Sequence, residues 1–295
     1  MSSTPQSPTW NRTLAWQIRR ELWEHRAIWI APLAVAAFTV LIHFLSTLVI
    51  SDAARAAALA DPARARDLMT HYKAMIGVTV LSGMVVGVLY SLETLHGERR
   101  DRSILFWKSL PVSDAMTVLS KALVVAVIIP LIVLGIVIAA TLVMITLQSL
   151  VWTLAGFDAS ALWSRIHLPF LWLSLLYGLP FMVLWNAPLF AWTLLVSAWS
   201  RRMPVLWAAA PFVAILLVEH TALHHTPAHW LIERRVAGAI LQPYSVNGAG
   251  AHWAQRLADL DPVRLYTLPG LWIGIVIAAV LLLAAIRVRR SRTPN

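Results

Sequence analysis

The chain has 295 residues, of which 59% are hydrophobic and only 13% are charged. One water-soluble core of ordinary size cannot hide that much apolar surface, so the composition predicts a membrane protein. The absence of cysteine excludes disulfides, thiolate catalysis, iron–sulfur clusters and cysteine-ligated zinc. A formal net charge of +10 would suggest nucleic acid in a soluble protein, but in a membrane protein the position of each charge matters more, and we expect no nucleic-acid partner.

The amino-terminal segment, residues 1–26, is polar and precedes an apolar run far longer than a signal-peptide core. We therefore expect it to be retained in the cytoplasm. It contains an apolar helical stripe and two tryptophans among arginines: Leu14, Ile18, Leu22, Trp16 and Trp23. Tryptophan and arginine together suit the lipid headgroup layer, which predicts an interfacial helix. The alternative is a charged flank that only orients the first span.

Six apolar segments follow within residues 27–295. A bilayer core about 30 Å thick needs about 20 apolar residues in a helix. Inside lipid every backbone polar group must bond within its own segment, which favours helices over strands. The segments that meet or approach this length are 27–50, 74–95, 116–148, 168–199, 204–218 and 268–286. The sequence therefore predicts an all-α polytopic protein with a single six-span membrane domain.

The predicted spans differ in length. Residues 116–148 and 168–199 would each extend about 48 Å as straight helices, so we expect tilts or kinks, for which Pro130, Pro180 and Pro188 are candidates. Residues 204–218 would reach only about 22 Å, which predicts a broken or re-entrant outer segment after this span.

The connections on the predicted outer side differ in length too. That broken segment would continue as an interfacial stretch to residue 267, because its tryptophans and tyrosines lie among polar residues. For the shorter outer loops, 51–73 and 151–167, we expect one or two helical turns each.

Lysine and arginine positions predict the orientation. They concentrate before the first span, between the second and third, between the fourth and fifth, and after the last. The positive-inside rule then puts both termini in the cytoplasm of a multi-pass protein of the inner (plasma) membrane. The residues on this predicted inner side are Arg12, Arg19, Arg20, Arg26, Arg99, Arg100, Arg102, Lys108, Lys121, Arg201, Arg202, Arg287, Arg289, Arg290 and Arg292.

The inner loop between the second and third spans combines charged and aromatic residues. Gly97 can end the second span and Ser113 can cap the third, which leaves residues 98–108 as a short cytoplasmic helix. We expect this helix to contact a protein partner through Glu98, Arg99, Arg100, Asp101, Arg102, Trp107 and Lys108. The alternative is a basic turn that only sets topology.

This region resembles the ABC-2 type permeases, the membrane subunits of ATP-binding-cassette exporters. Those proteins carry a Glu-Arg pair closing the second span, then a polar residue, a Leu-Pro-Val-Ser run and a lysine in the third span. Here these are Glu98 and Arg99, Ser103, the run 110–113, and Lys121. Asp114 and Ser103 depart from the commoner family residues. Six spans and an amino-terminal interfacial helix extend the resemblance loosely over the whole chain.

The resemblance implies that the inner helix docks onto a cytoplasmic ATPase subunit and that two permease copies, expected as a homodimer, line the substrate path. The sequence contains no G-x-x-x-x-G-K-[ST] phosphate loop. We therefore expect no enzyme activity and no bound cofactor in this chain by itself, since ATP and magnesium would be used by the partner. The expected cargo is an amphipathic or apolar compound, a peptide or a lipid, which would be exported.

Small residues recur every four positions along the second span, at Thr79, Gly83, Gly87 and Ser91. Such a stripe permits close approach of another helix. We favour packing within the chain over a contact between two copies.

Three polar residues in or beside the spans are candidates for a substrate path: Glu219, Asn186 and His43. Polar groups are costly in lipid and often line a pathway. Alternatively, His43 and Asn186 bond to a neighbouring helix, and Glu219 reaches the outer interface.

A group of histidines on the predicted outer side offers a second reading of the chain. His220, His224 and His229 lie at about one-turn spacing near Glu219 and Glu233, and such side chains can bind zinc or copper. A membrane enzyme with an outer-face metal site is therefore the alternative function. The spacing lacks a positioned general base, so we expect no functional metal.

Overall fold

The computed structural model describes residues 10–101, 113–222 and 260–291. Five helices make up the long elements: α2 (Ala27–Val49), α4 (Pro62–Arg100), α7 (Ile129–Leu154), α9 (Leu168–Trp199) and α13 (Pro269–Ser291). The shorter helices are α1 (Trp10–Glu24), α3 (Asp52–Ala60), α6 (Asp114–Leu123), α8 (Ser160–Arg165), α10 (Pro204–Ala222) and α12 (Pro262–Tyr266). A π-helical turn, η1 (Val124–Ile128), joins α6 to α7. All elements in these ranges are helical, as predicted.

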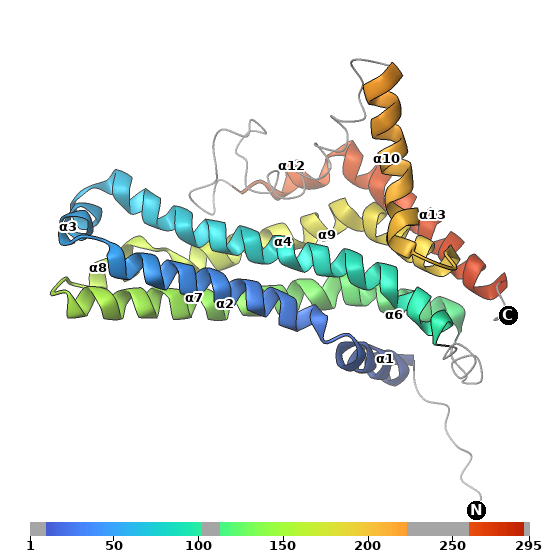
Figure 1. The fold of residues 1–295 in the computed structure, drawn as a ribbon, viewed down its shortest axis with the longest axis horizontal. Helices are drawn as coiled ribbons and strands as arrows, with labels where there is room; N and C mark the ends of the chain where they lie inside the picture. The colour runs from blue at the N-terminus through green and yellow to red at the C-terminus, as the bar shows by residue number, and fades with distance from the viewer. Residues whose placement is uncertain (1–9, 102–112, 223–259, 292–295) are drawn as a thin grey trace, which may run out of the picture.

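The long helices form an elongated bundle. In Figure 1, α2, α4, α7 and α9 lie lengthwise, and α13 packs along α9. One end, which we name the α1 end, holds α1, the last turn of α4, α6 and the last turns of α13. The opposite end, the α3 end, holds α3 and α8. The first and last described helices therefore meet at the same end of the bundle.

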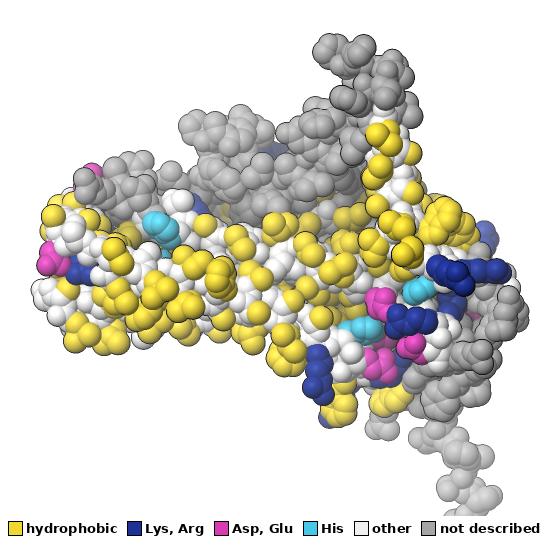
Figure 2. Space-filling view, in the orientation of Figure 1, with side chains coloured by type: hydrophobic (Ala, Val, Ile, Leu, Met, Phe, Trp, Pro, Cys, Tyr) yellow, Lys and Arg dark blue, Asp and Glu magenta, His cyan; other side chains and the backbone are white. Residues whose placement is uncertain are grey.

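Five helical segments are long and apolar enough to cross a membrane: 27–49, 68–100, 114–154, 160–199 and 269–291. Their outer surfaces expose large apolar side chains, among them Phe38, Leu41 and Leu131. Figure 2 shows apolar side chains covering the length of the bundle between polar groups at its two ends. The chain is thus a multi-pass membrane protein, as predicted from composition.

The sixth predicted span, 204–218, does not satisfy the same criteria of length and composition, since its described apolar part is only Pro204–Ile215. The first turns of α10 are fixed at the α1 end, where the rings of Trp199 and Trp207 lie edge to face at 5.0 Å. The rest of α10 leaves the bundle instead of running alongside it (Figure 1). The count of six crossings therefore stays a prediction.

Two local predictions are wrong. The loop 51–73 holds more than one or two turns, because α3 and the first turns of α4 occupy almost all of it, and the Ser51 hydroxyl caps α3 by accepting from the Ala54 N–H. The predicted inner helix does not begin at Glu98, because α4 continues through Gly97 to Arg100. Basic residues in the last turn favour this continuation. The rest of the predicted helix, from residue 102, lies outside the described residues.

The prolines act differently in the two longest apolar segments. Helix α9 continues through Pro180 and Pro188. Around Pro130, in contrast, the helix widens into η1, where the Ile129 N–H donates to the Val124 carbonyl five residues back. Proline has no N–H and its ring crowds the carbonyl four residues before it, which explains a widened turn at this place.

The small-residue stripe of α4 packs against other helices of the same chain. A Cβ placed on Gly83 would lie 2.5 Å from Val133 Cγ2 of α7, and one on Gly87 would lie 3.3 Å from the Phe190 ring of α9. Packing within the chain is therefore confirmed as a role of this stripe. It lets α4, α7 and α9 approach closely around a shared core.

Candidate functional site: a buried ionic cluster

Lys121 is the centre of a charged group at the α1 end. Its side chain is 1% exposed and extends from α6. The ammonium Nζ lies 2.7 Å from Glu21 Oε1 of α1 and 3.0 Å from Glu98 Oε1 of α4. It also donates a hydrogen bond to Thr94 Oγ1 at 2.6 Å. One cation thus joins three helices.

Glu98 extends the group to the carboxyl-terminal helix. Its second oxygen, Oε2, accepts a hydrogen bond from Arg289 Nη1 of α13 at 2.7 Å. Arg289 Nε in turn donates to Asp114 Oδ1, at the start of α6, at 3.0 Å. We name this group the ionic cluster and define it as Glu21, Glu98, Asp114, Lys121 and Arg289. It connects α1, α4, α6 and α13.

The carboxylate of Glu21 fixes α1 to the bundle. Its Oε2 accepts from the Tyr90 hydroxyl at 2.8 Å and from the Thr94 hydroxyl at 3.3 Å. Burial raises the pKa of this carboxyl, but the Lys121 ammonium and the hydrogen bonds from Lys121 and Tyr90 outweigh burial and hold the pKa below the ordinary value of 4.5. Glu21 is therefore ionised at neutral pH, and its charge is needed to balance Lys121.

The charges of the ionic cluster are nearly balanced. Three carboxylates face Lys121 and Arg289, and Arg20 adds a third cation, with Nη2 3.6 Å from Glu98 Oε1. Taking charges out of water is costly, and their mutual attraction offsets this cost only where the geometry is good. Removing one partner of such a group is costly, because it leaves a buried charge without its counter-ion.

Arg99 and His96 join the end of α4 to the end of α9. The Arg99 guanidinium donates to the carbonyls of Ser197 and Ser200, the latter at 2.7 Å. The Ser197 hydroxyl accepts from the backbone N–H of His96 at 3.0 Å. These bonds satisfy carbonyls that a helix end leaves without partners. Together with the ionic cluster, these bonds connect α1, α4, α6, α9 and α13 to one another at the α1 end.

The residues predicted to face a protein partner fall into two groups. Glu98 is buried and Arg99 half-buried, and each is bonded to other helices of the same chain, so a contact of these two residues with a partner stays a prediction. Arg100 and Asp101 have side chains 61% and 63% exposed, beside the connection that leads to α6. The remaining members, Arg102, Trp107 and Lys108, lie outside the described residues.

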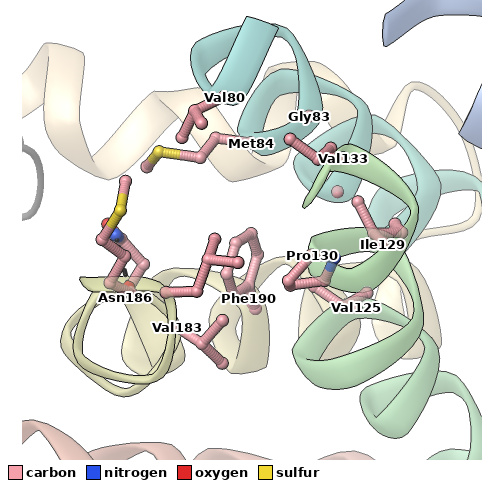
Figure 3. Close-up of a pocket in the computed structure, with 13 residues that line it drawn as sticks. Val80, Gly83, Met84, Val125, Ile129, Pro130, Val133, Val183, Asn186 and Phe190 are labelled. Carbon is pink, nitrogen blue, oxygen red and sulfur yellow. Dashed lines mark hydrogen bonds between the residues drawn. The ribbon is translucent and has the colours of Figure 1, made fainter. Parts of the chain in front are cut away.

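Asn186 lies on a small cavity inside the bundle (Figure 3). The cavity is lined by α4, the η1 region and α9, and Asn186 is its only lining residue with a hydrogen-bonding side chain; the amide donates to the Met182 carbonyl at 2.8 Å. Its volume is about 40 Å³, whereas an apolar cavity that holds benzene measures about 150 Å³. The cavity is too small to hold a cargo molecule.

His43 belongs to a polar group nearer the α3 end. Its Nε2 lies 3.4 Å from Gln148 Oε1, which also accepts from the Tyr72 hydroxyl at 2.8 Å. Three helices, α2, α4 and α7, meet there. This is the alternative foreseen for His43, a bond to a neighbouring helix, and it accounts for the residue without a substrate path.

The remaining predicted site residues lie at or beyond the end of α10. Glu219 and His220 fall in the last turn of α10, but their side chains are not described, and His224 and His229 lie outside the described residues. Within the described ranges, no three His, Cys, Asp or Glu side chains gather in a way that could hold a metal ion.

Sequence reasoning missed most of the ionic cluster. Glu21 and Lys121 are 100 residues apart and Glu98 and Arg289 are 191 apart, so no local pattern connects them. The available signal was an isolated charge within an apolar stretch, as at Lys121, which in a membrane helix calls for an opposite charge. The family resemblance and the positive-inside rule were the only sequence features that singled out Lys121.

Comparison with known proteins adds no identification at this point. No family model, no curated protein and no solved structure matches the chain.

Proposed function

We propose that this chain is the membrane-spanning subunit of an ABC-2 type exporter. It would move an amphipathic or apolar compound, a peptide or a lipid across the inner membrane, using ATP hydrolysed by a separate cytoplasmic subunit. The observation that carries the proposal is the ionic cluster at the α1 end. It connects the two helices that flank the 102–112 connection to α1 and α13.

A partner that pushes on the connection between α4 and α6 can move the spanning helices only if rigid contacts transmit the displacement to them. Glu98 lies in the last turn of α4, and Lys121 lies in α6, on the other side of that connection. Because these two residues are paired in the interior, a displacement of either helix end is passed directly to the other. This arrangement suits a subunit that has no phosphate loop and depends on a partner ATPase.

The helix directions support an even number of crossings. Helix α9 ends at the α1 end, where Ser197 bonds to α4, and α13 also ends there, where Arg289 meets Glu98. Two consecutive long helices that run the same way require the chain to return between them. Helix α13 begins beside the middle of α9, where Leu271 packs with Phe181 and Trp185. A short or re-entrant sixth crossing within residues 204–268 meets this requirement.

The proposal also includes cytoplasmic termini and a second copy of the permease. Both described terminal helices reach the α1 end, which is also the more basic end of the chain, as the positive-inside rule requires for a cytoplasmic face. Helix α10 exposes Leu206, Trp207 and Phe212, and a lipid or protein neighbour is needed to cover them.

The experiment is purification of a tagged chain from its native host in mild detergent. We expect a protein with a phosphate-loop motif to copurify in stoichiometric amount and to hydrolyse ATP in the complex. The paired variant Arg100→Glu/Asp101→Lys reverses two exposed charges beside the connection, and we expect it to lower ATP hydrolysis by the complex at least fivefold. The matched control is Asp158→Lys, an exposed charge reversal between α7 and α8 at the α3 end.

Two outcomes would contradict the proposal. One is a pure, stable preparation with no phosphate-loop protein. The other is a complex whose ATP hydrolysis changes equally in the paired variant and in the Asp158→Lys control.

A further inference from the structure

The π turn η1 is the only break in regular hydrogen bonding between residues 114 and 154. The Val124 N–H still donates to carbonyls three and four residues back, whereas the Ile129 N–H reaches five residues back, to Val124. A π turn holds one more residue than the α-helical turn it replaces. Pro130 follows directly and has no N–H, so an α-helical turn at this position lacks one hydrogen bond and is disfavoured relative to the π turn.

The cavity lies against this turn. Val125, Ile129 and Pro130 line one side, Val80, Gly83 and Met84 of α4 line a second, and Val183, Asn186 and Phe190 of α9 line a third (Figure 3). A Cβ on Gly83 would meet Val133 and one on Gly87 would meet Phe190, so α4 is packed closely here and the free volume is shared by the residues of α4, η1 and α9 that line it. This volume is too small for cargo, but it leaves room for the side chains of η1 to change position.

The turn also sets the direction in which Lys121 points. Lys121 lies three residues before η1, on α6. Converting the π turn to a regular α-helical turn turns α6 relative to α7 by the angle of one residue, about 100°, and shifts it by about 1.5 Å. The Lys121 ammonium would then leave Glu21 and Glu98, to which it is now bonded.

We propose that η1 is a hinge with two states, which moves Lys121 into and out of the ionic cluster. In the π state Lys121 is paired and α6 is locked to α1 and α4. In the α-helical state α6 is rotated, the pairs are broken, and the cavity beside η1 is refilled by the repacked turn. The proposal depends on the proposed function only for the force that drives the rotation, since the hinge itself is a property of this chain.

The test measures the reactivity of Lys121 in the purified chain in lipid nanodiscs, without any ATPase. A small amine-acetylating reagent is applied, and modification of each lysine is followed over time by peptide mass spectrometry. Lys73, whose side chain is exposed, serves as the reference within the same sample. In the native chain we expect Lys121 to react at least 20-fold more slowly than Lys73.

Two variants shift the hinge. Deletion of Val127 removes the extra residue of η1, and we expect the rate at Lys121 to rise at least tenfold. Pro130→Ala keeps every residue and restores an N–H that favours the regular helix, and we expect a rise of at least threefold. The matched control is Pro188→Ala in α9, where the helix is already regular, and we expect no change.

The proposal is overturned if both variants remain monodisperse with an unchanged rate at Lys73 while Lys121 stays as protected as in the native chain. If the deletion variant does not fold, Pro130→Ala alone decides. Because no ATPase is present in this test, its result does not depend on whether a partner copurifies with the chain. Conversely, the finding that η1 does not change conformation would not contradict the proposed permease function.

Discussion

A single ammonium, that of Lys121, lies between two carboxylates in a site from which water is almost excluded. From sequence alone, Glu98 and Lys121 could be placed on either side of the loop between the second and third predicted spans. The ion pair between them could not be predicted. The missing information was three-dimensional, since Glu21 and Arg289 come from the two ends of the chain. Residue chemistry indicated that an isolated charge in an apolar helix needs a partner, without indicating which one.

The first prediction concerns Lys121→Met. This substitution leaves Glu21 and Glu98 buried without their shared cation, and we expect it to destabilise the folded chain by about 3–5 kcal/mol. The double variant Lys121→Met/Glu21→Gln removes the buried charge of Glu21, whereas Glu98 keeps its Arg289 partner, and it should recover part of the loss. Thermal unfolding in one detergent measures both, with Lys73→Met as the control for removing an exposed lysine. Equal stability of Lys121→Met and the native chain would show that the cluster is not bonded as described.

The second prediction concerns acid. Because the folded-state pKa of Glu21 lies below 4.5, the stabilisation from its ionised form is fully present above about pH 4.5 and is lost as the pH falls through the lowered value. We expect the advantage of the native chain over Glu21→Gln in thermal midpoint to be constant from pH 7 to about pH 5 and to shrink below that. Both proteins in this comparison also carry His25→Gln, because His25 Nε2 lies 3.6 Å from Glu21 Oε2 and its titration would otherwise differ between them. An advantage that grows on acidification would contradict the ionised assignment.

At the scale of the helices, apolar length predicted the positions of five long segments well, while their ends were wrong by up to 12 residues at the start of α4. Lipid-spanning patterns locate the part of a helix inside the bilayer and carry no information on how far the helix continues beyond it. The continuation of α4 through Gly97 is accompanied by bonds from Arg99 and His96 to α9, which no local sequence pattern contains. The π turn at Pro130 could be foreseen only as an unspecified kink.

The third prediction compares two glycines of the same helix. A Cβ on Gly83 would meet Val133 at 2.5 Å, whereas one on Gly77 meets nothing within 4 Å. We expect Gly83→Ala to destabilise the chain by about 1–3 kcal/mol through overpacking. Gly77→Ala should instead stabilise it by about 0.5–1 kcal/mol, since glycine is a poor helix former.

Thermal unfolding of the two single variants makes this comparison, and Gly83→Ala/Val133→Ala, which removes the obstructing methyl groups, is the rescue control. Equal effects of the two single substitutions would contradict the close contact between α4 and α7.

At the scale of the whole molecule, composition was sufficient to predict an all-helical membrane protein, and the basic residues predicted that both termini share one side. The structure adds that the terminal helices are held together at one end by buried charges. It also shows that α10 does not run alongside the five long helices. The number of crossings therefore depends on residues 204–268, where the length of the apolar segment alone does not decide whether the chain crosses the membrane. The proposed function rests on the ends of α4 and α6 that flank residues 102–112, both of which lie at that end.

The account therefore depends on which side of the membrane the α1 end faces. The chain lacks cysteine, so a single cysteine can be introduced without removing any other. Asp101→Cys marks the α1 end and Asp158→Cys marks the α3 end, and both positions are exposed. Each variant is treated in intact cells with a membrane-impermeant thiol reagent. We predict labelling at position 158 from outside, and labelling at position 101 only after the cells are opened; labelling at 101 in intact cells, with 158 protected, would contradict a cytoplasmic ionic cluster driven by an ATPase.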